Sequence, residues 1–142
     1  MPFATCSACI SQGDEHVSWL AEHVDEENCY VTTVGRRSGK KHEVEIWFGV
    51  IADALYLISG NGSKADWYRN ALVTPAVSVR IQEETMVGIA RDVTDAAERR
   101  RVGEVMGAKY PWDGDASIGL TFPAWCFDVP ALAIESWAAA EE

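Results

Sequence analysis

Apolar residues recur at every second position in several short segments of the chain, which is the pattern of half-buried β-strands. In the clearest case Val44, Ile46, Phe48 and Val50 share one face of the segment 43–51. Other segments are rich in β-branched residues, which strands favour. These patterns predict strands over 29–34, 43–51, 54–59, 77–81, 85–93, 125–129 and 131–137.

Three further segments carry apolar residues at three- and four-residue spacing, which predicts helices. The first covers 14–24. The second follows Ser63, which we expect to be its N-cap residue, and ends before Pro75. The third covers 95–106. Its three consecutive arginines are expected to lie mostly on a solvated face: Arg99, Arg100 and Arg101.

Short turns join most of the predicted strands, and short turns imply antiparallel pairing. Too few long crossovers remain for a doubly wound parallel sheet. The pattern therefore predicts an α+β fold, a small closed or nearly closed antiparallel barrel with two or three flanking helices. A length of 142 residues fits a single domain over 1–142, in which we expect 1–13 to be a mobile tail.

The charge balance excludes some classes of partner. With 12 basic and 22 acidic residues the chain has a formal net charge of -10, which argues against general nucleic-acid binding and against attraction to anionic lipids. No apolar run approaches the roughly 20 residues of a membrane-spanning helix. We see no secretory signal, so the expected location is cytoplasmic.

Four of the 12 basic residues nevertheless fall within six positions, 36–41. Such a cationic loop on an acidic body predicts an anion-binding site. Backbone N–H groups near Gly35 and Gly39, the Ser38 hydroxyl and the guanidinium forks could all contact a phosphate. The spacing is not that of a P-loop, because three residues separate the glycines and a predicted strand follows. The simpler alternative is a solvated basic hairpin loop.

A second glycine-rich segment lies at 60–65 and matches the G-x-G-x-x-A dinucleotide fingerprint. We do not interpret it as a nicotinamide site, because the preceding strand already belongs to a hairpin. The glycines more readily permit close approach of a flat ligand. A helix start after Ser63 could face a second anionic group.

Six tryptophans and four tyrosines are many for this length, and packing explains most of them. Cys6 and Cys9 form a Cys-x-x-Cys pair for which we find no further ligands at metal spacing, so we predict a reduced pair and no metal site. The sequence shows no Ser-His-Asp cluster either, and no catalytic residue stands out.

The order of these segments is more specific than any one of them. Residues 31–40, Val-Thr-Thr-Val-Gly-Arg-Arg-Ser-Gly-Lys, are followed by a strand ending in Trp47, the glycine loop, an Asp-Trp-Tyr-Arg-Asn segment at 66–70 and a Pro-Ala-Val-Ser-Val strand. The chain thus resembles the deazaflavin-dependent nitroreductase family of actinobacterial oxidoreductases, most clearly over 29–82. The resemblance implies a split β-barrel of the pyridoxamine-phosphate-oxidase-like type.

The resemblance also implies a function and a site. It implies hydride transfer from the deazaflavin coenzyme F-420 to a small molecule, namely a quinone, a nitro compound or an activated alkene. Related split barrels are often homodimers. The residues implied to bind the cofactor's phosphate and acidic tail are Arg36, Arg37, Ser38, Gly39 and Lys40. Those implied to flank or close over its ring are Trp47, Ser59, Gly60, Asn61, Gly62, Ser63, Trp67 and Asn70. Tyr110 and Trp112 are implied to border the substrate.

The sequence departs from the family pattern at Glu45, where proline is usual, and in lacking a His-Pro before the Trp-Tyr segment. Two alternatives therefore stay open. One is a reductase that uses FMN in a similar pocket. The other is a non-catalytic protein whose barrel binds a lipid, haem or another ring ligand.

Overall fold

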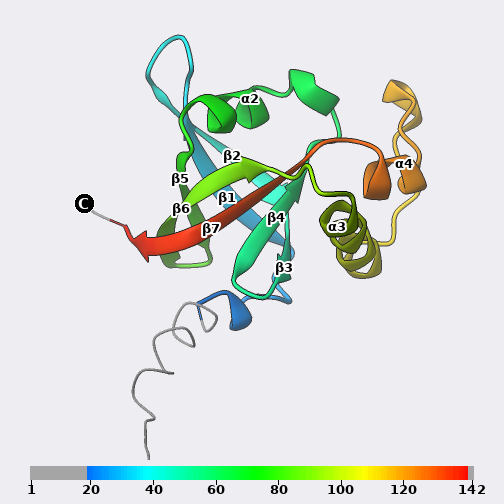
Figure 1. Cartoon of the computed structure of the whole chain (residues 1–142), viewed down its shortest axis with the longest axis horizontal. Helices are drawn as coiled ribbons and strands as arrows, with labels where there is room; N and C mark the ends of the chain where they lie inside the picture. Colours follow the sequence, from blue (N-terminus) through cyan, green and yellow to red (C-terminus); the bar gives the residue numbers. More distant parts are fainter. Residues whose placement is uncertain (1–18, 141–142) are drawn as a thin grey trace, which may run out of the picture.

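A single antiparallel sheet organises the chain in the computed structural model, which describes residues 19–140. Its seven strands lie in the order β2-β1-β5-β6-β7-β4-β3. Three α-helices and a helical turn at 19–21 accompany the sheet (Figure 1). The strands are β1 (Asn28–Val34), β2 (Lys41–Trp47), β3 (Gly49–Ile51), β4 (Ala54–Ile58), β5 (Ala76–Ile81), β6 (Glu84–Asp92) and β7 (Ala131–Ala139). The helices are α2 (Asp66–Val73), α3 (Ala96–Lys109) and α4 (Phe122–Phe127), with 3-10 turns η1 (Gly62–Lys64) and η2 (Ala116–Ile118).

The two edge strands of this sheet, β2 and β3, are separated in the sequence by Phe48 alone. A flat seven-stranded sheet would hold its edges far apart, since neighbouring strands lie about 4.8 Å from one another. The sheet must therefore curl until its edges meet at Phe48. This curled half-barrel with flanking helices confirms the predicted α+β barrel class. It also splits the strand predicted over 43–51 into two, because the chain changes pairing partner from β1 to β4 at Phe48.

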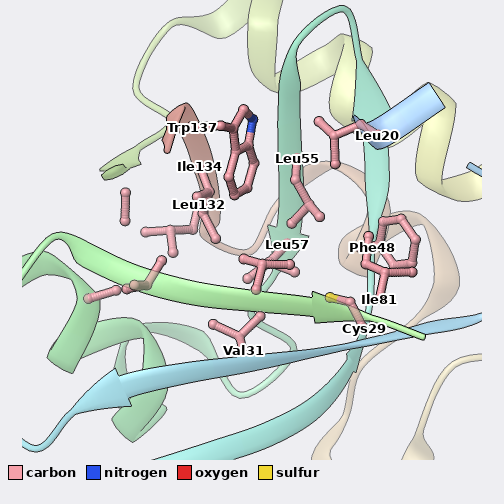
Figure 2. Close-up of a cluster of buried hydrophobic side chains, with 14 of the residues drawn as sticks. Leu20, Cys29, Val31, Phe48, Leu55, Leu57, Ile81, Leu132, Ile134 and Trp137 are labelled. Carbon is pink, nitrogen blue, oxygen red and sulfur yellow. The ribbon is translucent and has the colours of Figure 1, made fainter. Parts of the chain in front are cut away.

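The inside of the curl is filled by apolar side chains that alternate along the strands. On β5 the inward positions are Val77, Val79 and Ile81, as the alternation predicts, and all three are buried. Figure 2 shows how the side chains of this interior cluster meet, among them Val31, Leu57 and Leu132.

A second apolar cluster lies on the outer side of β4 and β7, where α3 and α4 cover them (Figure 1). All five residues of β4 are buried, because Leu55 and Leu57 face the curl while Tyr56 and Ile58 face the helices. α3 begins at the predicted position: the Asp95 carboxylate accepts the N–H of Glu98 at 2.8 Å. β4 is thereby fixed from both faces, and it positions the glycine loop that follows it.

The prediction of a strand over 125–129 was wrong. Most of this segment belongs to helix α4. A short apolar run cannot be distinguished by its periodicity from a buried helix. The helix begins at Thr121, whose hydroxyl accepts the Ala124 N–H at 3.1 Å, and Pro123 suits its first turn.

The expectation for Arg99 was also wrong. Its guanidinium is half-buried and donates to the carbonyls of Val129 (2.8 Å), Cys126 and Trp125, so it satisfies groups left open at the end of α4. Burial lowers the pKa of Arg99 from its usual value.

Helix α2 ends at Val73, before Pro75, as predicted, but Ser63 is not its N-cap residue. Ser63 lies within the 3-10 turn η1, and Ala65 caps α2 without a side-chain hydrogen bond. The extra turn moves the start of the helix to Asp66.

Most of the predicted helix 14–24, the tail 1–13 and the pair Cys6 and Cys9 lie outside the described residues, so these expectations stay predictions. Within 19–140, no helix combines the length and the apolar composition needed to cross a membrane.

The contact between α3 and α4 provides a test of this packing. A Cβ atom on Gly103 would overlap the Cys126 carbonyl oxygen and lie 2.5 Å from the Phe127 ring. In a free helix Gly→Ala stabilises by about 1 kcal/mol. Here we expect Gly103→Ala to lower the free energy of unfolding by about 1–3 kcal/mol, because overpacking outweighs propensity. Urea denaturation measures the change.

The matched control is Gly107→Ala on the same helix, whose Cβ would meet only side-chain atoms, Cys126 Sγ at 3.0 Å and Phe122 Cζ at 3.4 Å. We expect a smaller loss of stability there, because those side chains can shift. Equal or greater stability of Gly103→Ala relative to the unsubstituted protein would contradict the described contact.

Candidate functional site

The basic segment forms a tight hairpin loop between β1 and β2 (the cyan loop in Figure 1). Gly35 N–H donates to the Lys40 carbonyl at 2.7 Å, and Gly39 N–H donates to the Gly35 carbonyl at 2.9 Å. Gly39 has a φ of 74°, a conformation that glycine adopts without strain. The Ser38 hydroxyl accepts the Lys40 N–H at 3.1 Å. The loop is therefore held in one shape by its own hydrogen bonds.

Asn70 of α2 binds this loop through Arg36. Its side-chain oxygen accepts both the Arg36 backbone N–H (3.1 Å) and the Arg36 guanidinium (2.8 Å), and Asn70 itself is only 3% exposed. Arg36 also forms an ion pair with Asp66 at 3.2 Å. Arg36 is thus largely committed to positioning the loop. Its charge is already opposed by Asp66, which leaves Arg37 and Lys40 as the more accessible cations.

A cavity of about 460 Å³ lies against the loop, and we name it the loop cavity. Arg37 and Ser38 line it, whereas Lys40 and Gly39 do not. Its full lining is Thr33, Gly35, Arg36, Arg37, Ser38, His42, Glu43, Val44, Asp66, Trp67 and Asn70. Guanidinium, hydroxyl and backbone N–H donors here suit an anion, although two carboxylates reduce the net positive charge.

A second cavity, of about 320 Å³, lies beyond Trp67 and has mostly aromatic and aliphatic walls. We name it the aromatic cavity. Trp67 lines both cavities, so they adjoin at its ring. The lining of the aromatic cavity is Ile46, Trp47, Ile58, Gly60, Asn61, Trp67, Trp112, Asp115, Ile118, Leu120 and Trp125.

The glycine loop contributes to this wall only in part. Gly60 and Asn61 line the aromatic cavity, but Ser59, Gly62 and Ser63 do not. Ser59 is buried, and its hydroxyl donates to the Gly62 carbonyl at 2.6 Å. Ser59 therefore shapes the loop rather than lining the cavity, and Ser63 is exposed in η1.

Tyr110 supports the site from behind Trp47. The two rings stack with centroids 4.4 Å apart and an interplanar angle of 5°. The Tyr110 hydroxyl accepts the Phe48 N–H at 3.2 Å and donates to the Glu27 carbonyl at 2.7 Å. Burial raises the pKa of Tyr110 to about 12. Tyr110 is absent from the lining of both cavities, so its position argues for a packing role, whereas Trp112 does line the aromatic cavity.

Three tryptophans meet nearly at right angles here. Trp47, Trp112 and Trp125 have centroid distances of 5.6–5.8 Å and interplanar angles of 84–88°. The Nε1 atom of Trp112 is buried without a hydrogen-bond partner among the described residues. Trp125 was not among the predicted site residues, and its segment was predicted to be a strand rather than helix α4. The Thr121 cap and Pro123 were the signal that could have placed it on a helix.

One further group of potential ligands lies away from these cavities, where Glu22, His23 and Glu84 approach one another. His23 Nε2 is 2.9 Å from Glu84 Oε1, while its buried Nδ1 has no partner among the described residues. Metal-bound histidines almost always donate the other ring N–H to an acceptor. The arrangement therefore favours a simple His–Glu contact.

Comparisons with known proteins bear on the family and on the fold. Residues 13–118 match the family described as F420H(2)-dependent quinone reductase. No curated protein matches the sequence. An F420-H2 dependent reductase is 22% identical, with 78% of this chain and 95% of that chain covered and a TM-score of 0.60. A second, described as an F420 reductase, is 17% identical, with 82% and 94% covered and a TM-score of 0.59. A Listeria innocua protein assigned as a pyridoxamine 5'-phosphate oxidase is 16% identical, with 92% and 99% covered and a TM-score of 0.61. At these identities the structural matches bear on the fold, which they identify as the split barrel.

The contact between the loop and α2 can be tested by amide hydrogen exchange. Asn70→Ala removes the acceptor of the Arg36 N–H and leaves Thr33 without its 3.4 Å contact. We expect exchange in 36–40 to accelerate and the free energy of unfolding to fall by about 1–3 kcal/mol, because buried polar groups lose their partner. Asn61→Ala, at an exposed position, is the control and should leave exchange in 36–40 unchanged. Unaltered exchange in Asn70→Ala would show that the loop is held by other contacts.

Proposed function

Since the chain belongs to the family of F420H(2)-dependent quinone reductases, we propose that it transfers hydride from reduced coenzyme F-420 to a quinone. The family makes the chain an oxidoreductase whose cofactor is this deazaflavin. Nitro compounds and activated alkenes are further acceptors of the same reaction type, and we propose them as secondary substrates.

The observation that carries the proposal is the shared wall at Trp67. The loop cavity offers Arg37, Ser38 and N–H donors to a phosphate and an acidic tail. The aromatic cavity offers flat walls at Trp47 and Trp112 to a ring. Because Trp67 lines both, one elongated ligand with an anionic end and a planar end can occupy both cavities. The residues present thus offer cationic and N–H donors for the anionic tail of the cofactor and flat aromatic walls for its ring.

The bound cofactor supplies the hydride, and the chain supplies position and surroundings. We propose that Arg37 and Ser38 bind the tail, that Asn70 and Arg36 keep the loop in shape, and that Gly60 and Asn61 border the ring. The tryptophans exclude water from one side of it. Tyr110 is bonded to backbone groups, so we propose that solvent supplies the proton a quinone needs.

The competing functions fit the same residues less well. FMN also carries a phosphate that the loop could bind, but the family match favours the deazaflavin. An uncharged lipid would leave the guanidinium groups of the loop cavity without an anionic partner. The propionates of a haem could bind them, but the family match favours the deazaflavin. A small-molecule substrate follows from the family, while a homodimer stays a prediction.

Charge at the loop is tested by titrating oxidised F-420 and following its fluorescence quenching. Arg37 lines the loop cavity and Lys40 does not. We expect Arg37→Ala to weaken binding about fivefold at low salt, Lys40→Ala less than about twofold, and the exposed α3 variant Arg100→Ala not at all. Salt at about 0.5 M should shrink the Arg37 effect, because it screens exposed charges.

FMN titrated in parallel should bind more weakly than F-420. The loop assignment fails if Arg37→Ala and Lys40→Ala both leave the F-420 affinity unchanged at low salt. Tighter binding of FMN would favour the alternative cofactor instead.

A further inference from the structure

A third cavity, of about 420 Å³, adjoins the aromatic cavity at Trp47. The two share Ile46, Trp47, Ile58 and Trp125. The lining specific to the third cavity is Asn28, Glu45 and Met106, and we name it the acidic cavity. A molecule there would lie beside the ring site and away from the loop, which is where a hydride acceptor has to approach.

The charged side chains divide sharply along the site. The loop cavity is lined by Arg36 and Arg37 with two opposing carboxylates. The aromatic and acidic cavities together are lined by only two ionisable residues, Glu45 and Asp115, and by no Lys, Arg or His. The side chains that line this end therefore present negative charge to a ligand, and the chain's net charge of -10 has the same sign.

Glu45 is the carboxylate that is not neutralised. Its side chain is exposed, and its Oε2 accepts the Tyr30 hydroxyl at 3.2 Å. The nearby Arg80 lies over the Tyr30 ring at 4.2 Å, but its ion pair is with Glu43 at 3.7 Å. Among the described residues no basic group forms an ion pair with Glu45. Its hydrogen-bond partner is neutral, so its charge stays available to a ligand.

Asp115 also carries a negative charge, but its carboxylate forms hydrogen bonds within the chain. Its carboxylate accepts the Ser117 N–H at 3.0 Å and the Ser117 hydroxyl at 2.5 Å, which shapes the turn η2. Substitution of Glu45 therefore tests whether the aromatic and acidic cavities prefer ligands of one charge.

The aromatic walls favour the same kind of ligand. Indole faces attract cations through their quadrupole, and the effect grows when water is excluded. Trp47 and Trp125 line the acidic cavity next to Glu45. A flat cation thus finds both a carboxylate and aromatic surface, whereas an anion would be repelled.

Apart from its two carboxylates, the lining offers no side chain that commonly donates a proton. None of the residues lining the aromatic and acidic cavities is His, Cys, Lys or Tyr. An acceptor that is already a cation needs no proton. A C–H bond of the reduced deazaflavin would break, and the hydride would add with that electron pair to an electron-poor ring atom of the acceptor. One bond to hydrogen thus breaks, one forms, and the positive charge of the acceptor is neutralised. The deazaflavin is oxidised, and the proton it loses goes to solvent.

We propose that this end of the site takes flat aromatic acceptors with a delocalised positive charge, and that Glu45 selects them. The inference rests on the proposed function, because it assumes that hydride comes from the reduced deazaflavin. Reduction makes the acceptor neutral, so its attraction to Glu45 is lost and product release is favoured.

The test compares two coloured acceptors, the cation methylene blue and the anion 2,6-dichlorophenolindophenol. Oxidation of reduced F-420 is followed with each dye for the unsubstituted protein, for Glu45→Gln and for the control Glu104→Gln, which is exposed on α3 and lines none of the three cavities. We expect Glu45→Gln to raise the KM for methylene blue about fivefold and to leave kcat and the F-420 affinity unchanged. The KM for the indophenol should stay equal or fall.

Tryptophan fluorescence quenching by methylene blue, without reduced cofactor, gives a readout independent of turnover. A Kd that rises in Glu45→Gln and not in Glu104→Gln supports the proposal, and an unchanged Kd overturns it. An equal change of KM for both dyes also overturns it. Absence of turnover with either dye and with quinones would contradict the proposed function, while the quenching result would still decide the role of Glu45.

Discussion

The arrangement of the whole molecule depends on how the backbone is held at Phe48. This single residue joins the two edges of the sheet, so its conformation fixes how far the sheet curls. The Tyr110 hydroxyl contacts both its N–H and its carbonyl, and Lys109 Nζ donates to the same carbonyl at 3.0 Å. Lys109 also lies 3.7 Å from the centroid of the Phe48 ring. The end of α3 thereby clamps the junction. Because Tyr110 stacks on Trp47, the same clamp orients the central ring of the site.

From this junction the site extends in two directions with opposite electrostatics. Toward the loop, Arg36 binds Asn70 and Asp66, whereas Arg37 is exposed and forms no ion pair within residues 19–140. In the direction of the aromatic and acidic cavities, the charged residues of the lining are the carboxylates Glu45 and Asp115. At physiological ionic strength charges are screened over about 8 Å, so each end of the site keeps its own local field despite the acidic body. Such a division suits a reaction in which an anionic cofactor tail and an acceptor must occupy neighbouring places without competing.

The sequence predicted the elements whose pattern is local and missed those that depend on distant partners. The alternation in 77–81 and the cap at Asp95 were enough to predict β5 and the start of α3 correctly. The strand over 43–51 was continuous in its pattern, and only its pairing with β1 and then with β4 divides it. α4 was missed because a short apolar run carries no period that separates helix from strand. Arg99 was misplaced because its carbonyl partners lie in helix α4 and in Val129 just after it, 26–30 residues away in sequence.

For the site, the motif order selected residues of which some line the cavities and others do not. Gly60, Asn61, Trp67 and Trp112 line the cavities, whereas Ser59 and Tyr110 support the walls from behind. Glu45 was noted only as a departure from a family pattern, and its place in the acidic cavity became apparent with the fold.

The most direct test of the central claim is a crystal structure of the protein with oxidised F-420. The account predicts the phosphate of the cofactor within hydrogen-bonding distance of Arg37 and Ser38, and the deazaflavin ring beside Trp47, with Trp67 between the two ends. A cofactor bound elsewhere, or one whose tail points toward Glu45, would contradict it.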